Sequence, residues 1–459
     1  MPVALPEGSR QKRPARTLAV ILVGLGTLAG LLAIVLDWSV PARAAIIAAT
    51  CVSLWLLELV PKWTPTVLLW IATPLLLATT GGSSGAAFMP ARVLAWSVDP
   101  VLALFLGGFA LAAAASAQGA DRVVAVLAMR LSRGQPVRLV VLVAIATAVL
   151  SMWMSNVAAA ALMLAALHPV IAADHSPTGS IRRPLLLAIA LAADVGGIAT
   201  PVGTGSNGIA LAALEPTHPI SFVQWMFFGV PLAFGLLAAA LAVIIWRTKP
   251  EGVIAVPDAA PLPVTAATWR LVGVFSVTVL LWVTEPLHGV RAWMVALGTV
   301  GVLLLSRLIR WRDVRSMDWS TLLLIAGGIA LGALLDQSGL VRAGAAHIPL
   351  DGVPPYVRLL VLCLASALLS AVMSNTATAA FLVPLALTLD PAPSTAIIVA
   401  VSTSFGVPFV ISTPPNAMVV GTGLLRSREL LMPGMLILLG GCALVALTGP
   451  WMLRVLGIP

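Results

Sequence analysis

Two polar motifs with the same spacing interrupt long apolar stretches of this 459-residue sequence. The motifs are Ser151-x-x-x-Ser155-Asn156 and, 219 residues later, Ser370-x-x-x-Ser374-Asn375. Their hydroxyl and amide oxygens, together with backbone groups released where a helix ends, are ligands that suit a hard cation such as sodium. Polar groups in the middle of an apolar stretch are costly unless they line a cavity or are buried in protein. The pair of motifs therefore predicts a binding site.

A second pair of polar stretches, 196–208 and 406–416, is rich in Gly, Pro and Thr. They contain Gly203-Thr204-Gly205-Ser206-Asn207 and Ser412-Thr413-Pro414-Pro415-Asn416. Because Gly and Pro interrupt helices, each stretch should divide a span into two half-helices. Half-helix N-termini present N–H donors to carboxylates, and C-termini present carbonyl oxygens to a cation. Helix packing through small residues is the alternative, but two Ser-Asn pairs, each followed by a broken span, favour binding.

The composition requires a membrane around these motifs. The chain is 60% hydrophobic and only 9% charged, whereas a soluble protein carries about 25% charged residues. The net charge of +9 does not indicate a nucleic-acid partner, because the basic residues occur singly or in short groups between apolar runs. We predict an all-α, polytopic protein of the lipid bilayer.

Long apolar stretches indicate eleven membrane-spanning helices, since about 20 residues cross the bilayer. They lie near residues 17–36, 42–60, 63–79, 99–118, 183–213, 221–246, 270–284, 291–306, 319–336, 394–423 and 430–457. Two further stretches, 136–172 and 356–389, are too long for one crossing and carry the Ser-Asn pairs near their middles. We expect each of them to form a re-entrant hairpin, which enters and leaves on the same side of the membrane.

The two halves of the chain resemble each other in further detail. The sequence Leu106-Gly107-Gly108-Phe109-Ala110-Leu111 recurs as Ala326-Gly327-Gly328-Ile329-Ala330-Leu331. We divide the chain into an N-terminal tail with the first helix (1–41), a first repeat (42–247), a cytoplasmic linker (248–268) and a second repeat (269–459). The first repeat contains hairpin 136–172 and broken helix 183–213, and the second contains hairpin 356–389 and broken helix 394–423. Five spans per repeat, an odd number, predict two inverted repeats, as in many secondary transporters.

The basic residues indicate the orientation and the coupling. With the N-terminus in the cytoplasm, 20 of the 26 Lys and Arg residues face the cytoplasm, as the positive-inside rule requires. The C-terminus then lies outside the inner (cytoplasmic) cell membrane. No Lys or Arg occurs within 139–181, 184–246 or 359–425, so an anion bound among the motifs has no fixed positive partner there. This absence predicts that the anion is carried together with cations.

The doubled motifs resemble those of the divalent anion/sodium symporter family, which carries dicarboxylates, citrate and sulfate. The similarity covers nearly all of the chain from about residue 42. The resemblance implies substrate contacts from Ser155, Asn156, Val157, Thr204, Ser374, Asn375, Thr376, Thr413 and Pro414. It implies one Na+ ion at Ser151, Ser155, Asn156 and Gly203, and another at Ser370, Met373, Asn375 and Ser412. It also implies a homodimer in which a transport domain moves like an elevator past a scaffold.

Three features depart from the family pattern or stand apart from it. Val157 occupies the Thr position of the first Ser-Asn-Thr motif, and Gly205-Ser206 replaces the usual Pro-Pro pair of the first broken span. Asp194 is the lone acid in the span that leads to this break. Since an acidic residue inside a membrane span indicates a function, we interpret Asp194 as an extra cation or proton site. The alternatives are a polar structural group beside the break and an ion-pair partner for a cytoplasmic Arg.

We predict a secondary active transporter that imports a small divalent anion with sodium. The C4-dicarboxylates succinate, malate and fumarate are the first candidates. Two carriers of the same superfamily are alternatives, namely a cation/proton antiporter and an oxyanion carrier for sulfate or arsenite. We predict no enzymatic activity, because no His lies in either hairpin core or broken span and no His-Glu-x-x-His or Gly-x-Gly-Asp motif occurs.

Overall fold

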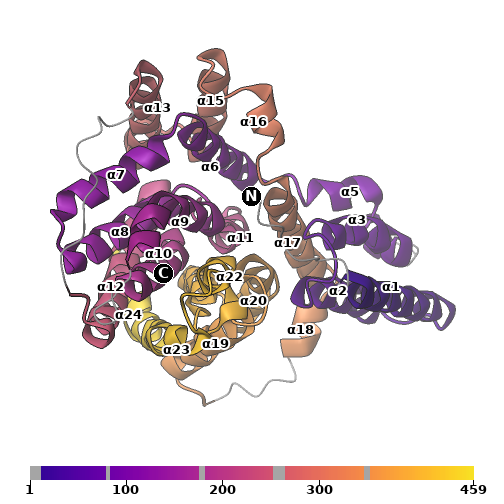
Figure 1. Ribbon diagram of the computed structural model, residues 1–459. Coiled ribbons are helices and arrows are strands. Elements are labelled where there is room, and N and C mark those ends of the chain that lie inside the picture. Colours follow the sequence, from indigo (N-terminus) through magenta and orange to yellow (C-terminus); the bar gives the residue numbers. More distant parts are fainter. Residues whose placement is uncertain (1–11, 79–82, 175–180, 252–263, 346–351) are drawn as a thin grey trace.

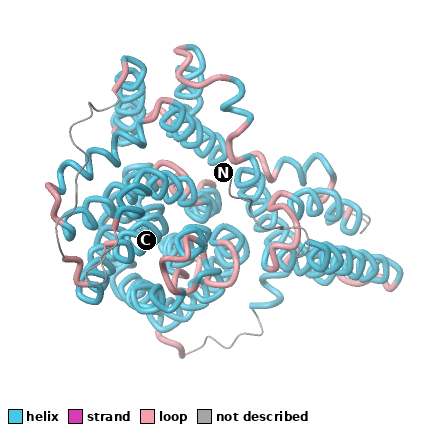
Figure 2. The backbone as a smooth tube through the Cα atoms, in the orientation of Figure 1, coloured by secondary structure: helices cyan, strands magenta, loops and turns pink. Residues whose placement is uncertain are grey.

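The computed structural model describes residues 12–78, 83–174, 181–251, 264–345 and 352–459. Throughout these ranges the regular structure is helical and contains no strand (Figure 2). This is expected in lipid, where a helix satisfies its own backbone hydrogen bonds. Seven of the described helical segments are long and apolar enough to span a membrane, namely Thr17–Val35, Pro100–Ala117, Asn156–Ala173, Phe222–Thr248, Ala266–Val283, Trp319–Gln337 and Ser427–Val455. The chain is an all-α, multi-pass membrane protein, as predicted.

The first half of the chain contains helices α1 to α12. They are α1 (Lys12–Val35), α2 (Val40–Leu56), α3 (Thr64–Leu77), α4 (Ser83–Ala86), α5 (Pro90–Ala95), α6 (Pro100–Ala117), α7 (Ala120–Ser132), α8 (Pro136–Ser151), α9 (Asn156–Ala173), α10 (Arg182–Gly196), α11 (Gly205–Leu214) and α12 (Phe222–Thr248). Proline at the first or second position begins α2, α3, α5, α6 and α8, where its missing N–H has no cost. Helix α7 lies outside the spans and hairpins predicted from the sequence.

The second half contains helices α13 to α24. They are α13 (Ala266–Val283), α14 (Glu285–His288), α15 (Ala292–Leu305), α16 (Trp311–Arg315), α17 (Trp319–Gln337), α18 (Leu340–Ala345), α19 (Pro355–Ser370), α20 (Asn375–Leu389), α21 (Pro393–Ser402), α22 (Pro414–Gly421), α23 (Ser427–Met435) and α24 (Gly441–Val455). A π-helical turn, Leu436–Gly440, joins α23 to α24. The order of elements in α6–α11 therefore recurs in α17–α22: a Gly-Gly helix, a short helix, a helical pair and a broken helix.

The two halves pack through reciprocal contacts. Helix α6 packs against α15 of the other half, where a Cβ on Gly107 would lie 2.5 Å from the Cβ of Ala296. Helix α17 packs against α3 in the same way, with Gly327 against Thr66. Likewise, α11 contacts α20 and α21, and α22 contacts α9 and α10. The repeated Gly-Gly sequence thus has a structural role, since the absent Cβ permits both close approaches.

The helices form groups around a central region. In Figure 1, α8–α12 and α19–α24 form one rounded lobe, while α1–α3, α5 and α18 lie to the right and α13, α15 and α16 at the top. Helices α6 and α17 lie between these groups and the lobe. A smaller apolar core unites α2, α3, α17 and α18. The two broken helices, α10–α11 and α21–α22, therefore lie within the lobe, next to both helical pairs.

Candidate functional site

The first Ser-Asn motif forms the turn between α8 and α9. Ser155 is the N-cap of α9, and its Oγ accepts a hydrogen bond from the Ala158 backbone N–H at 3.3 Å. The Ser151 hydroxyl lies 2.9 Å from Asn156 Oδ1 and 2.6 Å from the carbonyl oxygen of Ala193 in α10. Ser151 therefore connects the turn to the broken helix and fixes the orientation of the Asn156 amide.

The second Ser-Asn motif has the same local structure between α19 and α20. Ser374 is the N-cap of α20 and accepts a hydrogen bond from the Ala377 N–H at 3.2 Å. The Ser370 hydroxyl donates to Asn375 Oδ1 at 2.7 Å. The repeated sequence thus forms a repeated turn, because N-cap serines and a serine-to-asparagine bond are both local interactions.

The first broken helix is held open by an asparagine. Asn207 Nδ2 donates to the carbonyl oxygens of Gly197 at 3.0 Å and Thr200 at 2.8 Å. These carbonyls belong to the interrupted end of the helix and would otherwise have no partner there. The Thr200 hydroxyl donates to the Met152 carbonyl oxygen of the first turn. The break is therefore a defined structure that contacts the Ser-Asn turn.

The second broken helix uses the same device. Asn416 Nδ2 donates to the carbonyl oxygens of Val407 at 2.9 Å and Phe409 at 3.0 Å. A Cβ on Gly406 would lie 2.5 Å from the carbonyl oxygen of Ala367 in α19, so glycine permits this break to contact its helical pair. The side-chain oxygens of Asn207 and Asn416 are both buried without a hydrogen-bond partner in the described structure.

Oxygen atoms converge where the first break meets the first turn. A Cβ on Gly197 would lie 2.8 Å from Asn156 Oδ1 and 3.0 Å from the Gly203 carbonyl oxygen. The Ser151 hydroxyl lies beside the same Asn156 oxygen. A hydroxyl, an amide oxygen and a backbone carbonyl are the donors that hard cations prefer. The residues that the family resemblance assigns to the first sodium ion therefore do lie together.

One cavity of about 530 Å³ joins both turns and both breaks. The predicted site residues on its wall are Ser155, Asn156, Val157, Asp194, Gly203, Thr204, Met373, Ser374, Asn375, Thr376, Ser412, Thr413 and Pro414. The other two predicted residues, Ser151 and Ser370, are fully buried and do not line the cavity, but each bonds to its motif asparagine. The volume falls within the range of small-molecule binding sites.

Asp194 connects the two halves within this cavity. The Thr413 hydroxyl, at the N-cap of α22, donates to Asp194 Oδ2 at 2.8 Å. The Asp194 residue is only 1% exposed, and its Oδ1 atom has no hydrogen-bond partner among the described residues. The carboxyl group therefore belongs to the site, and it lies where the first broken helix meets the second.

The cavity also has charged residues that the sequence analysis did not select. Glu58, Lys62 and Asp318 line it and are solvent-exposed, so they lie at its mouth. Asp318 is the N-cap of α17 and accepts a hydrogen bond from the Thr321 N–H at 3.0 Å. In the sequence Glu58 lies at the end of the predicted span 42–60, while Lys62 and Asp318 lie just outside predicted spans, where basic residues indicate orientation. Helix packing is what brings them to the mouth.

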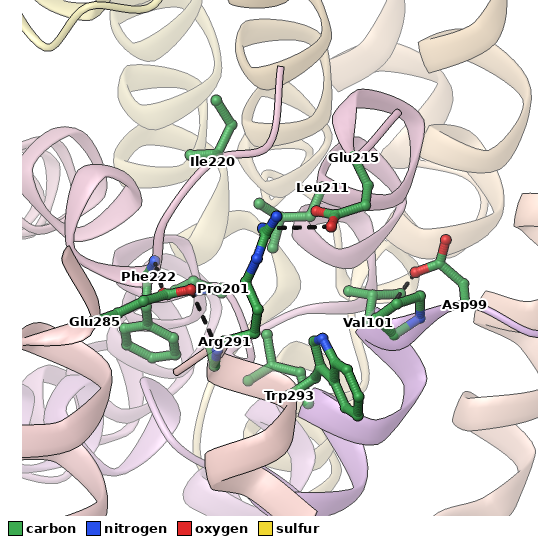
Figure 3. Close-up of a pocket in the computed structure, with 13 residues that line it drawn as sticks. Asp99, Val101, Pro201, Leu211, Glu215, Ile220, Phe222, Glu285, Arg291 and Trp293 are labelled. Atoms are coloured by element: carbon green, nitrogen blue, oxygen red, sulfur yellow. Dashed lines mark hydrogen bonds and ion pairs between the residues drawn. The ribbon is translucent and has the colours of Figure 1, made fainter. Parts of the chain in front are cut away.

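A second, smaller pocket lies on the other side of the first break (Figure 3). Pro201 lines this pocket, whereas the next residues along the break line the central cavity. Arg291 forms an ion pair with Glu215 at 3.4 Å, and Glu285 accepts hydrogen bonds from the Phe222 and Ala292 N–H groups, each at 3.3 Å. The pKa of Glu215 is raised above its usual value, because the effect of burial exceeds the opposing effect of Arg291.

This second pocket is a junction between helix ends. Its polar groups come from the ends of α6, α11, α14 and α15, and its acidic residues outnumber its single arginine (Figure 3). These carboxylates already bond to Arg291 or to backbone N–H groups, and the pocket encloses only about 50 Å³, which is below the range of small-molecule sites. The central cavity, in contrast, presents hydroxyls, amides and helix termini, so it is the candidate binding site.

The fold and the cavity define the class of protein, which is a multi-pass membrane transporter. The family model described as citrate transporter matches residues 52–403. The chain belongs to this family, and the predicted relationship to anion carriers is confirmed. The family and the relatives below are transporters rather than enzymes.

Three known proteins illustrate the similarity. An uncharacterized transporter of Haemophilus influenzae is 30% identical over 383 residues, which cover 78% of this chain and 82% of the relative. The sodium-dependent dicarboxylate transporter SdcS of Staphylococcus saprophyticus is 28% identical over 423 residues, which cover 83% of this chain and 80% of the relative. The structure of the YdaH transporter of Alcanivorax borkumensis superposes with a TM-score of 0.59 at 18% identity, over 85% of this chain and 98% of that one.

Proposed function

We propose that this protein imports a small divalent anion together with sodium, with the C4-dicarboxylates succinate, malate and fumarate as the first candidates. The observation that carries the proposal is the single cavity into which both Ser-Asn turns and both helix breaks project. A dicarboxylate has two separated anionic ends, and the cavity has two copies of one motif to receive them. The similarity to SdcS, a sodium-dependent dicarboxylate transporter, supports the same substrate class and ion.

In this proposal the anion is bound by neutral donors. The N-termini of α9, α11, α20 and α22 lie at the motifs, and N–H groups at helix starts attract carboxylates. Substrate contacts then come from Ser155, Asn156, Val157, Thr204, Ser374, Asn375, Thr376, Thr413 and Pro414. Lys62 lies at the exposed mouth, where it attracts anions but leaves the buried site without a fixed cation.

Sodium supplies the missing positive charge. One ion is placed at Ser151, Ser155, Asn156 and the Gly203 carbonyl, and the other at Ser370, Met373, Asn375 and Ser412. In the first group, the Asn156 amide oxygen and the Gly203 carbonyl oxygen both lie beside Gly197, and the Ser151 hydroxyl is 2.9 Å from that amide oxygen. Because burial of an uncompensated anion costs several kcal/mol, sodium binding and anion binding should strengthen each other. This reciprocity is the basis of symport.

The arrangement of the helices suits alternating access. With the N-terminus in the cytoplasm, the mouth at Lys62 faces inward, and the pocket at Arg291 faces outward on the far side of the first break. We infer an elevator in which the lobe of α8–α12 and α19–α24 carries the site past the other helices (Figure 1). A homodimer with a cytoplasmic N-terminus and an external C-terminus, built from two inverted repeats with re-entrant hairpins, completes the proposal.

The test is uptake by purified protein in liposomes. An inward sodium gradient should drive accumulation of labelled succinate, and choline in place of sodium should abolish it. Unlabelled malate, fumarate, citrate, sulfate and arsenite are then added as competitors. Uptake that persists in choline without a proton gradient would overturn sodium symport. Competition by sulfate or arsenite alone would favour the oxyanion carrier, and sodium–proton exchange without any anion would favour the antiporter.

A further inference from the structure

Asp194 is a buried acid that belongs neither to the two proposed sodium groups nor to the proposed anion contacts. It lies in the last turn of α10, just before the first break, and is 1% exposed. None of the described ion pairs includes it. A carboxylate this deeply buried is strongly destabilised unless a positive charge lies next to it.

The position of Asp194 within its helix adds to this demand. The C-terminal end of a helix carries a partial negative charge, which disfavours an acid and favours a cation. The Ala193 carbonyl at this end already accepts the Ser151 hydroxyl. Local electrostatics therefore make the end of α10 a place for a cation.

The hydrogen bonds of Asp194 leave one oxygen available. Oδ2 accepts from Thr413, whereas Oδ1 is buried with no partner among the described residues, and Asp194 lines the central cavity. Asn156 lies close by, because the Ser151 hydroxyl is 2.9 Å from its Oδ1 and 2.6 Å from the carbonyl oxygen of Ala193, the residue before Asp194. An unpaired carboxylate oxygen beside an amide and a hydroxyl is a suitable start for a sodium site.

The corresponding turn of the second half holds no acid. Thr403 occupies the corresponding turn of α21–α22, and its hydroxyl donates to its own helix at the Ala400 carbonyl, at 2.7 Å. The pair of Ser-Asn turns therefore explains a pair of cations, and Asp194 adds one negative charge that this pair does not balance.

We propose that Asp194 anchors an additional co-transported sodium ion between the two helix breaks, so that each anion is accompanied by one cation more than the Ser-Asn turns hold. This proposal rests on the proposed sodium symport. Asp194 Oδ1 is the anchoring ligand, and Asn156 and Thr413 are its polar neighbours. The ion is shared between the halves, because its ligands come from α9, α10 and the N-cap of α22.

The experiment measures the number of cations per anion in proteoliposomes. Sodium and anion gradients are held fixed, and the membrane potential at which net anion flux is zero gives the coupling ratio. Asp194→Asn preserves the shape of the side chain and an acceptor for Thr413, and it should lower the ratio by one sodium ion. Asp194→Glu should keep the wild-type ratio.

Asp318→Asn is the matched control. It removes one carboxylate charge from the same cavity, but Asp318 is exposed at the mouth, and asparagine also caps helices well. This variant should keep the wild-type ratio. A ratio lowered equally by Asp318→Asn and Asp194→Asn would overturn the proposal, because it would show a general effect of charge.

Equilibrium binding of radioactive sodium to detergent-purified protein, at saturating succinate, covers variants that no longer transport. Asp194→Asn should bind one sodium ion fewer per chain than the wild type. Equal binding and an equal ratio would overturn the proposal and return Asp194 to a structural role. If the wild-type protein transports no anion with sodium, symport fails, and the binding measurement still decides whether Asp194 holds a cation.

Discussion

The two halves of the molecule have the same turn but use it in different electrostatic surroundings. In both halves a serine hydroxyl bonds to the motif asparagine, at 2.9 Å in the first and 2.7 Å in the second. At the breaks the halves differ. The Thr204 hydroxyl lies 3.2 Å from Ser206 in its own half, whereas Thr413 reaches across to Asp194. The repeat therefore preserves the ligand geometry, while single substitutions make the two ends of the site unequal.

The residues that depart from the family pattern also lie at contacts between the two halves. A Cβ on Gly205 would lie 2.5 Å from the Thr376 hydroxyl oxygen, so this threonine occupies the space that a larger residue would need. The corresponding contact between the second break and the first motif is looser. Helix α22 packs against α9 there, but Pro414 is exposed, and Val157, which replaces threonine, is 40% exposed. Gly205 and Thr376 are therefore in close contact across the two halves.

The largest effect should come from removing either motif asparagine. Asn156→Ala and Asn375→Ala should each lower sodium-driven uptake by about 100-fold or more, since each removes a cation ligand and its orienting bond. Uptake is measured in proteoliposomes at matched protein content. Gln118→Ala is the control, because Gln118 bonds to the Leu308 carbonyl outside the cavity. Normal uptake by Asn375→Ala would break the equivalence of the two turns.

A smaller effect should follow from adding a methyl group at Gly205, where the first break contacts Thr376. Gly205→Ala should destabilise the protein by about 1–3 kcal/mol, because the new methyl group collides with Thr376. The melting temperature should fall, and Thr376→Ala should restore it in the double variant. Gly421→Ala, where a Cβ meets nothing within 4 Å, is the control. A double variant no better than Gly205→Ala would contradict the pairing.

The Thr376 hydroxyl has no counterpart in the first motif, which has Val157 at this position. It therefore tests whether the two ends of the proposed site bind the substrate unequally. Thr376→Val should weaken the apparent affinity for succinate about 10-fold, as expected for a lost hydrogen bond to a charged group. Val157→Thr should change affinity less and in the opposite direction. The concentration giving half-maximal uptake measures both. Equal losses in the two variants would mean that position 376 acts through packing.

The smallest effect should come from the pocket on the far side of the break. Arg291→Gln and Glu215→Gln should each change uptake by less than about 2-fold, because their ion pair is solvent-accessible and such pairs contribute about 0–1 kcal/mol. Initial uptake rates measure this change. A large loss in either variant would show that the junction takes part in transport and that the central cavity is not the whole site.

Much of the site could be predicted because its parts are local. The Ser-Asn turns depend on residues five apart or less, and N-cap serines are recognised by their place before a helix. Gly and Pro in 196–208 and 406–416 indicated the breaks for the same reason. The predicted residues therefore appear on one cavity wall, with only Ser151 and Ser370 lying behind it.

The remaining features could not be predicted, because they join distant segments. Asp194 and Thr413 are 219 residues apart, and no periodicity in the sequence pairs them. Lys62 reaches the cavity mouth only because α2 and α3 pack beside α17. Helix packing brings these distant residues together, and the local sequence pattern does not specify the angles and contacts of that packing.

From the sequence alone it follows that this chain lies in a membrane and that polar motifs recur in its two halves, and four polar segments are predicted to form the binding site. These conclusions are possible because lipid demands helices that satisfy their own backbone, and because polar groups within apolar spans need a reason. The shared cavity of the four segments and the bond from Thr413 of the second break to Asp194 of the first emerge only from the folded chain. Both depend on long-range packing, in which glycines such as Gly107 and Gly327 let helices of opposite halves approach.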